Sequence, residues 1–345
     1  MHPMPNPMAR LVAGVPLPLV VIGPDLLVHE ANSAAQALLS VSGETLVGRH
    51  HGLLIRAPEV LGAIGRALNA GEWAVVRMVT PSAGADRVHE VTVTPLDSGV
   101  LLAFADLTEA EEMDRMRRDF VANVSHELRT PLTAISGFVE TLQGAAKDDP
   151  EARMRFLTIM AAETERMNRL VRDLLHLSRV EAEERIRPET RVDLAAIARS
   201  VGDSLQPVAQ AAEVRLALEG VEAPIELRAD ADQMVQVLTN LTENAIKYGS
   251  PAGATVTLAL KRDTGPRGPV LRVDVVDQGA GIDARHIPRL TERFYRVDSH
   301  RSRAMGGTGL GLAIVKHIVQ RHRGRLVIES EPGSGSKFSV LLPML

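Results

Sequence analysis

The 345-residue sequence contains no cysteine, and this absence excludes disulfides, thiolate metal sites and thiol nucleophiles. It also lacks a long uncharged run. The longest one near the start, residues 11–24, is shorter than the roughly 20 residues that a membrane-spanning helix needs, and prolines interrupt it. We interpret this run as the approach to a buried strand. We expect a cytoplasmic chain with no transmembrane segment, for which association with the inner membrane would need a partner.

The sequence has no strong excess of either charge. It has 39 Lys and Arg residues against 43 Asp and Glu residues, which gives a formal net charge of −4 and no electrostatic reason to expect nucleic-acid binding. Hydrophobic residues make up 45% and charged residues 24%, as in soluble globular proteins. The length is sufficient for two or three domains of ordinary size.

The first segment, residues 1–107, has the pattern of five strands with short helices between the second and the third. A Gly-Pro-Asp turn at 23–25 separates the first two strands, and a helical stretch covers Ser33–Leu39. Three strand-like runs, "WAVVRMV", "HEVTVTPL" and "VLLAFADL", close the segment. The pattern predicts a small α/β sheet domain. The hairpin "VVIGPDLLVHEAN" and the closing "FADLTE" resemble a PAS domain, a common sensory module.

Two long helical patterns make up the second segment, residues 108–186. The first covers Thr108–Gln143, a short polar turn covers 144–150, and the second runs to about residue 184. Each carries apolar residues spaced by threes and fours, and one such hairpin cannot bury both apolar faces by itself. The pattern therefore predicts an antiparallel helical hairpin that forms a dimeric four-helix bundle, and hence a homodimer. The alternative is a monomeric helical linker packed on its neighbours.

The third segment, residues 187–345, alternates helices with strand-like runs. Helices are expected near 193–212, 231–248 and 309–322. Strands are expected in "VRLALEG", "IELRAD", "ATVTLALK", "VLRVDVVDQG", "GRLVIESEPG" and "SKFSVLLP". The arrangement predicts a mixed sheet covered on one face by helices, which is a two-layer α/β sandwich. The whole chain is therefore expected to be a multidomain α+β protein.

Two stretches of this last segment have side chains suited to a nucleotide and its metal ion. In "NLTENAIKY" (240–248), Asn240 and Asn244 lie one helical turn apart, with Lys247 and Tyr248 nearby. Side-chain amide oxygens are suitable ligands for Mg²⁺. In "DQGAG" (277–281), Asp277 can accept a hydrogen bond from an exocyclic amine such as that of adenine. The two glycines that follow, Gly279 and Gly281, let the backbone approach the ring.

Two glycine-rich stretches complete the pattern. "GGTGLGLAIVKHIV" (306–319) is a loop that leads into a helix, whose first amides suit phosphate oxygens, and "PGSGSKF" (332–338) is a turn between strands. In this order the four stretches resemble the ATP-binding domain shared by histidine kinases, DNA gyrase, the Hsp90 chaperone and the MutL ATPase. The resemblance implies ATP and Mg²⁺ as cofactors, with Asn240 and Asn244 at the metal. The further nucleotide-binding residues that it implies are Ile282, Arg296, Gly307, Thr308, Gly309, Leu310, Gly311 and Leu312.

Residues 297–306, just before the glycine-rich loop, are polar, basic and small, and they predict a mobile lid over the bound nucleotide. Gln278 departs from the commonest form of the family motif, which has asparagine at this position. We expect it to face the pocket through its side chain only, without harm to ATP binding.

One histidine is predicted to be exposed on a helix that has a buried face. Phe120, Val124 and Leu128 share one side of the helix, whereas His126 lies about 200° around the helix from Val124. A neutral, exposed imidazole has a free lone pair and can attack the γ-phosphorus of a nucleotide. Glu127 can take or share the proton on the other ring nitrogen. Four further histidines are predicted to be ordinary surface residues, namely His176, His286, His317 and His322.

The stretch "SHELRTPL" (125–132) resembles the phosphoacceptor box of sensor histidine kinases. The resemblance implies that His126 is phosphorylated from ATP and then passes the phosphoryl group to an aspartate of a response regulator receiver domain. It implies that Thr130, one turn beyond His126, supports a phosphatase activity toward that partner. Pro131 is expected to bend the helix just beyond the site.

The sequence of the phosphoacceptor region most resembles that of phosphate-starvation sensor kinases. This resemblance suggests phosphate-starvation signalling as the pathway, but it does not identify the signal. Two other functions stay open at this point. One is an ATPase of the gyrase or Hsp90 class, which clamps a client and phosphorylates no histidine. The other is a scaffold that mainly dephosphorylates its partner, although the intact Asn244, Asp277 and glycine-rich loops argue against a decayed kinase.

Overall fold

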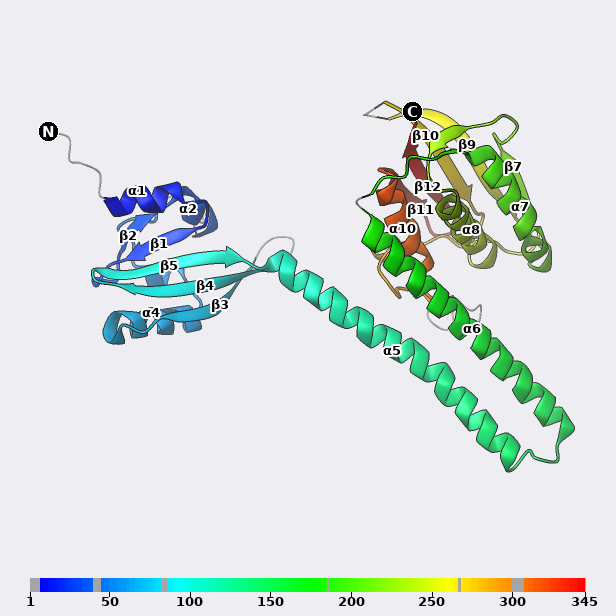
Figure 1. The fold of residues 1–345 in the computed structure, drawn as a ribbon, viewed down its shortest axis with the longest axis horizontal. Coiled ribbons are helices and arrows are strands. Elements are labelled where there is room, and N and C mark those ends of the chain that lie inside the picture. The colour runs from blue at the N-terminus through cyan, green and yellow to red at the C-terminus, as the bar shows by residue number, and fades with distance from the viewer. Residues whose placement is uncertain are drawn as a thin grey trace. The chain divides into compact units, whose positions relative to one another are not determined.

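The computed structural model describes residues 7–39, 45–81, 86–184, 186–265, 268–298 and 307–344. The chain forms two compact units, Met1–Ala122 and Asn123–Leu345, and each is described by itself (Figure 1). Within the described residues, no helix has the length and apolar character needed to span a bilayer.

The first unit is built on a five-stranded antiparallel sheet of spatial order β2-β1-β5-β4-β3. Among the residues that the structure describes, three helices lie between the second and third strands in sequence, which confirms the predicted PAS-like order of elements. The elements are α1 (Pro7–Gly14), β1 (Leu19–Ile22), β2 (Val28–Ala31), α2 (Ser33–Leu39), α3 (His51–Leu54), α4 (Pro58–Ala70), β3 (Ala74–Thr80), β4 (Arg87–Leu96) and β5 (Gly99–Asp106).

Strand β1 shows why the sheet is covered on both faces. Val20 and Ile22 are buried in the main core, which also contains the apolar face of α4, whereas Leu19 and Val21 pack with Val12 of α1. This alternation follows from the two-residue repeat of a strand. Helix α1 is not among the predicted elements. The start of the uncharged run is therefore helix, and the buried strand begins only at Leu19.

A buried asparagine ties α1 to the sheet. The Asn32 side chain is 4% exposed; its Nδ2 donates to the carbonyl oxygens of Val12, Val15 and Leu17 at 2.7–3.2 Å. Its Oδ1 accepts hydrogen bonds from the backbone amides of Leu19 (3.1 Å) and Ala35 (2.9 Å). These bonds satisfy backbone groups that neither the helix nor the sheet pairs.

Replacing Asn32 with alanine is expected to lower the free energy of unfolding of the first unit by about 2–4 kcal/mol, because several buried polar groups lose their partner. The single tryptophan of the sequence, Trp73, lies in this unit, so denaturant unfolding followed by its fluorescence reports on the unit selectively. Asn69→Ala, at an exposed position near the end of α4, is the control and should change the midpoint little. Equal midpoints for the two variants would refute the role given to Asn32.

Two long helices follow, α5 (Thr108–Gln143) and α6 (Pro150–Glu183). They confirm the predicted helical hairpin. Asp149 caps α6 by accepting a hydrogen bond from the Ala152 amide at 2.9 Å, and Pro150 occupies the first helical position. Helix α5 continues through Pro131 to its end, so the bend expected there stays a prediction.

Large apolar side chains remain exposed along both helices of this hairpin. Met113 and Met154, for example, are 66% and 67% exposed. The other exposed members are Met116, Val121, Leu132 and Val139 on α5, and Leu157, Ile159, Val171 and Leu175 on α6. A single chain therefore leaves much of the apolar surface of the hairpin in water.

The rest of the second unit is a layered α/β structure, which we call the sandwich. Its main sheet has the spatial order β11-β12-β10-β9-β7 and is mixed, because β7 and β9 are parallel and the other pairs antiparallel. The elements are β6 (Arg191–Asp193), α7 (Leu194–Ala211), β7 (Arg215–Glu219), β8 (Glu226–Arg228), α8 (Ala231–Lys247), β9 (Thr255–Gly265), β10 (Gly268–Val276), the 3-10 helix η1 (Ile287–Arg289), α10 (Gly311–Arg321), β11 (Arg325–Ser330) and β12 (Ser336–Pro343).

Helices α7, α8 and α10 lie on one face of this sheet, as predicted (Figure 1). One predicted strand is present but lies outside the main sheet. The run "IELRAD" contains β8, which does not join the main sheet but pairs with β6 in a separate two-stranded sheet. Strand β6 is only three residues long, so no alternating pattern marks it in the sequence.

The prediction of a surface position for His322 is wrong. His322 is 2% exposed; its Nε2 accepts a hydrogen bond from the Asp230 amide at 3.0 Å, and its Nδ1 lies 2.8 Å from the Ile318 carbonyl oxygen. Burial lowers the pKa of His322. The residue thus connects the end of α10 to the start of α8, where Asp230 caps the helix. The other three histidines lie near the surface, bonded to Gln236, Tyr295 and Glu184.

Candidate nucleotide-binding site

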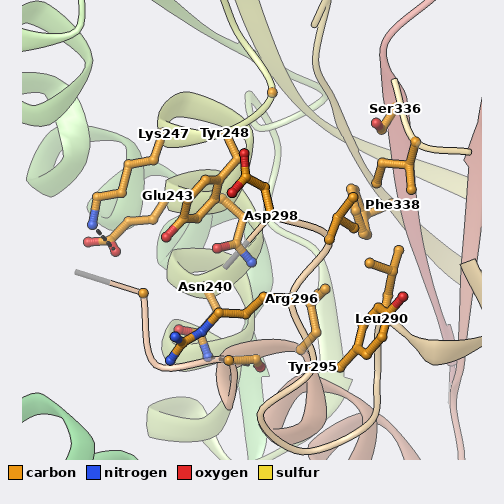
Figure 2. A pocket seen from close by; sticks show the side chains of 18 of the residues that line it. Asn240, Glu243, Lys247, Tyr248, Leu290, Tyr295, Arg296, Asp298, Ser336 and Phe338 are labelled. Atoms are coloured by element: carbon orange, nitrogen blue, oxygen red, sulfur yellow. Dashed lines mark hydrogen bonds and ion pairs between the residues drawn. The ribbon is translucent and has the colours of Figure 1, made fainter. Parts of the chain in front are cut away.

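A cavity of about 380 Å³ opens in the sandwich between α8, the loop after β10, the segment before the glycine-rich loop, and β12. Figure 2 shows Asn240, Glu243 and Lys247 of α8 on one side of it, with Ser336 and Phe338 of β12 across from them. The cavity is large enough for a small organic ligand, and its walls combine apolar rings with charged groups.

Asp277 follows directly after β10 and is held in place by backbone groups. Its Oδ1 accepts hydrogen bonds from the amides of Gly279 and Ser336, both at 3.0 Å. The side chain is 4% exposed, and burial raises the pKa of its carboxyl group. Because both backbone donors bind Oδ1, Oδ2 is the oxygen available to a ligand. A fixed acceptor of this kind suits an exocyclic amine.

The glycines next to Asp277 are required by close backbone contacts. A Cβ atom on Gly279 would lie 1.9 Å from the Gly249 carbonyl oxygen, and one on Gly281 would lie 1.9 Å from the Glu331 carbonyl oxygen. Gly281 also has a φ of 69°, which disfavours other residues. The Gln278 side chain points elsewhere: its Oε1 accepts a hydrogen bond from the Thr255 amide at 3.1 Å, and the residue does not line the cavity.

Gly279→Ala is expected to weaken nucleotide binding at least about 10-fold. The added Cβ atom would clash with the backbone carbonyl oxygen of Gly249, so the loop backbone must shift, and Asp277 shifts with it. Gly65→Ala is a matched control, since a Cβ atom at Gly65 meets nothing within 4 Å. Calorimetric titration with ADP gives the affinity of each variant. An unchanged affinity in Gly279→Ala would mean that this loop does not position Asp277.

The α8 side chains differ in how they are held. Nδ2 of Asn240 donates to the Gly311 carbonyl oxygen at 3.4 Å, and the Nζ of Lys247 pairs with Glu243 Oε2 at 2.9 Å. The Asn244 side chain lines the cavity without a hydrogen bond to any described residue. Tyr248 closes this side, and burial raises the pKa of its hydroxyl. Asn244 is therefore the side chain of α8 that a ligand can engage at least cost, whereas Lys247 must first leave Glu243.

The glycine-rich loop leads into α10. Thr308 Oγ1 accepts a hydrogen bond from the Leu310 amide at 3.3 Å and donates one to Asp173 Oδ2 of α6 at 2.7 Å. Gly309 has a φ of 74°, and its carbonyl oxygen accepts a hydrogen bond from the Phe294 amide at 2.8 Å. These hydrogen bonds fix the described part of the loop, which begins at Gly307.

Most of the predicted nucleotide-binding residues lie around this one cavity. Asn240, Asn244, Lys247, Tyr248, Asp277, Gly281, Ile282, Arg296, Gly307, Thr308, Gly309, Gly311 and Leu312 all line it. Gly279 and Leu310 do not line it and act through the backbone contacts given above. Of the predicted lid, residues 299–306 lie outside the described residues. The cavity is also lined by Val297 and Asp298 of the predicted lid, and by residues that the sequence did not single out: Arg169, Asp173, Glu243, Gly249, Ala280, Leu290, Tyr295, Ser336 and Phe338.

The phosphoacceptor stretch lies on α5 in the same compact unit. His126 is exposed, which confirms the prediction from the helical pattern. Thr130 donates its hydroxyl to the His126 carbonyl oxygen at 3.1 Å. The Glu127 carboxylate pairs with two arginines: its Oε2 lies 2.7 Å from an Arg166 nitrogen and 3.2 Å from an Arg296 nitrogen. Arg296 lines the cavity, so a residue next to His126 contacts the nucleotide site.

This fold and this cavity define the class of protein: an ATP-binding module, linked by a helical hairpin to a sensory-type domain. Three family models match the chain along its length. Residues 12–112 match the PAS fold, 116–183 the His Kinase A (phospho-acceptor) domain, and 229–345 the histidine kinase-, DNA gyrase B- and HSP90-like ATPase. In this order, these are the domains of a sensor histidine kinase.

Several curated proteins named as sensor proteins or sensor kinases are similar to this chain. The chain is 41% identical over 239 residues to the phosphate regulon sensor protein PhoR of Pseudomonas aeruginosa, which covers 69% of this chain and 53% of the relative. It is 40% identical over 242 residues to the sensor-like histidine kinase SenX3 of Mycobacterium tuberculosis (70% and 57%), and 38% identical over 245 residues to the sensor histidine kinase WalK of Bacillus subtilis (71% and 39%). The chain thus matches about half the length of these relatives.

One solved structure has the same fold over nearly the whole chain. It is the histidine kinase ThkA in complex with the response regulator protein TrrA, with a TM-score of 0.52, 21% identity, and coverage of 97% of this chain and 98% of that one. This similarity confirms the predicted combination of a sheet domain, a helical hairpin and an α/β sandwich.

Proposed function

We propose that the protein phosphorylates His126 from ATP and then transfers the phosphoryl group to an aspartate of a response regulator receiver domain. The observation that carries this proposal is the contact between the two sites. His126 is exposed on α5, and its neighbour Glu127 reaches Arg296 of the nucleotide cavity at 3.2 Å. The phosphoacceptor stretch and the ATP site are therefore parts of one compact unit.

In the first step, a ring nitrogen of His126 forms a bond to the γ-phosphorus while the bond from that phosphorus to the β-γ bridging oxygen breaks, and ADP leaves. The proton of the imidazole must be taken up, for which Glu127 is the proposed base. Its carboxylate is engaged by Arg166 and Arg296, so it has to leave at least one of them before it can serve His126. Lys247 and Arg296 are proposed to neutralise phosphate charge.

Mg²⁺ is the proposed metal ion, held by Asn244 and Asn240. The residues fit it: the Asn244 side chain is unengaged in the described part of the chain, and Glu243 lies beside it in the cavity. No group of three or more His, Asp or Glu side chains that could hold a metal occurs among the described residues. Mg²⁺ keeps most of its waters and binds largely through phosphates, so few protein ligands are needed. When bound, it supplies charge neutralisation at the phosphates.

The exposed apolar residues of the hairpin support a homodimer, in which α5 and α6 of two chains pack as a four-helix bundle.

We further propose three domains, with boundaries at 1–107, 108–186 and 187–345. The proposed compartment is the cytoplasm, where ATP is available. Thr130 lies one turn from His126 and supports the proposal of a phosphatase activity toward the partner. The relative PhoR is named for the phosphate regulon, and phosphate-starvation signalling is the proposed pathway.

The alternative, a clamp-type ATPase, predicts a different fate for the γ-phosphate. A kinase retains label from γ-labelled ATP on the chain, whereas a clamp ATPase releases all of it as inorganic phosphate. We expect retained label in the wild type, none in His126→Gln, and normal labelling in His176→Gln, which alters another helical histidine. Rapid phosphate release without retained label in any variant would favour the clamp ATPase.

A further inference from the structure

Helix α6 contributes a carboxylate to the nucleotide cavity. Asp173 lines the cavity, and its Oδ2 accepts the hydroxyl hydrogen bond of Thr308 at 2.7 Å. Thr308 lies in the glycine-rich loop, whose amides lead into α10 and suit phosphate oxygens. A side chain of the hairpin therefore occupies part of the surface that is built to receive an anionic ligand.

The surroundings of Asp173 do not favour a permanent charge. Burial raises the pKa of its carboxyl group, although the Thr308 hydroxyl and the nearby His176, Arg172 and Arg169 oppose this effect. Glu127, by contrast, lies between two arginine side chains. A buried carboxylate with one neutral donor is weakly held, and a second anion in the same cavity would repel it.

We propose that Asp173 is an intramolecular competitor for the nucleotide phosphates at the glycine-rich loop, so that docking of the hairpin on this loop and binding of ATP weaken each other. This inference rests on the proposed function, because it takes the cavity to be the ATP site. A carboxylate oxygen and a phosphate oxygen accept from the same donors, and only one of them can occupy Thr308. The coupling must be reciprocal, since it is a free energy shared by the two binding events.

Other contacts also hold the hairpin on the sandwich. Arg293 pairs with Glu181, and His317 Nδ1 lies 3.0 Å from Glu184 Oε2. The nucleotide is thus expected to weaken these contacts together with the Asp173–Thr308 bond, because all of them join the hairpin to the sandwich. Such loosening frees Glu127 and the neighbouring His126 for the transfer step, and it makes nucleotide occupancy a control on docking.

The direct test measures ligand affinity in the full chain with ADP, which requires no phosphoryl transfer. Asp173→Asn is expected to bind ADP roughly 10-fold more tightly than the wild type, because the competing charge is removed. Adenosine, which has no phosphate, should bind both proteins equally. Glu165→Gln removes an exposed acid of the same helix that pairs with Arg172, and it should leave both affinities unchanged. Unchanged or weaker ADP binding in Asp173→Asn would overturn the proposal.

A second measurement does not depend on the folding of that variant. Because the chain has no cysteine, Glu181→Cys and Arg293→Cys can be linked by a short bis-maleimide to keep the hairpin docked. The linked protein is expected to bind ADP roughly 10-fold more weakly than the same protein before linking. Equal affinities would overturn the proposal. If neither form binds ADP at all, the proposed function fails; if both bind it equally, only this inference fails.

Discussion

Replacing Asp277 with asparagine is expected to lower ATP affinity roughly 100-fold without unfolding the protein. The reason is the direction in which the side chain is held. Both backbone donors, the amides of Gly279 and Ser336, bind Oδ1. In the variant the amide oxygen takes that place, so the NH₂ group takes the place of Oδ2. A donor then faces the exocyclic amine of adenine, where the wild type has an acceptor.

The same geometry predicts a change of specificity. Hypoxanthine has a carbonyl oxygen where adenine has its amine, so the variant should bind ITP better than ATP, while the wild type prefers ATP. Asp203→Asn, at an exposed position on α7, should behave as the wild type. Calorimetric titrations with ATP and ITP give the four affinities. Equal losses for both nucleotides in Asp277→Asn would contradict the proposed contact.

The pKa of Asp277 adds two expectations. Burial raises it, so the ionised carboxylate destabilises the fold at neutral pH, and this cost disappears when the group is protonated or replaced by asparagine. Asp277→Asn should therefore unfold at no lower denaturant concentration than the wild type. Protonation removes the acceptor charge, so the ATP affinity of the wild type should fall with decreasing pH from a higher pH than an exposed aspartate would give.

Asn244→Ala is expected to reduce phosphorylation of His126 on the order of 100-fold and to abolish the Mg²⁺ dependence of ATP binding. Asn244 has an unengaged side chain in the described residues, whereas Asn240 is bonded to the Gly311 carbonyl oxygen. The two residues should thus differ. Asn240→Ala is expected to weaken the connection between α8 and α10 as well as binding, and to lower the free energy of unfolding.

Asn244→Asp is the matched control for this prediction. A carboxylate oxygen is also a good ligand for Mg²⁺, so the variant should keep a Mg²⁺ dependence that alanine loses. ATP affinity is measured with and without Mg²⁺ in each variant. If Asn244→Ala responds to Mg²⁺ as the wild type does, the assignment of Asn244 as a metal-binding residue is wrong.

The parts of the site that the sequence could predict are those set by local geometry. Asn240 and Asn244 share a helix face because of the helical repeat, Asp277 ends a strand, and His126 lies opposite Val124 on α5. The exposed imidazole followed from spacing alone. The strands of the first unit were predictable from runs of strand-forming residues bounded by turn residues, such as the Gly-Pro-Asp turn at 23–25.

The parts that could not be predicted depend on contacts between distant segments. Asp173 belongs to an ordinary stretch of amphipathic helix, and only its position against Thr308, 135 residues further along, makes it part of the cavity. The pairing of Glu127 with Arg296 spans 169 residues. His322 was assigned to the surface because the sequence does not show that the Asp230 amide needs a partner there.

The central claim is that the exposed imidazole on α5 accepts the γ-phosphoryl group. The most direct measurement is ³¹P NMR of the purified protein after incubation with ATP and Mg²⁺, followed by mapping of the modified residue. The account predicts a phosphoramidate resonance that is stable in alkali, lost in acid, located at His126 and absent in His126→Gln. A protein that binds and consumes ATP but never shows this resonance, or shows it equally in His126→Gln, would contradict the account.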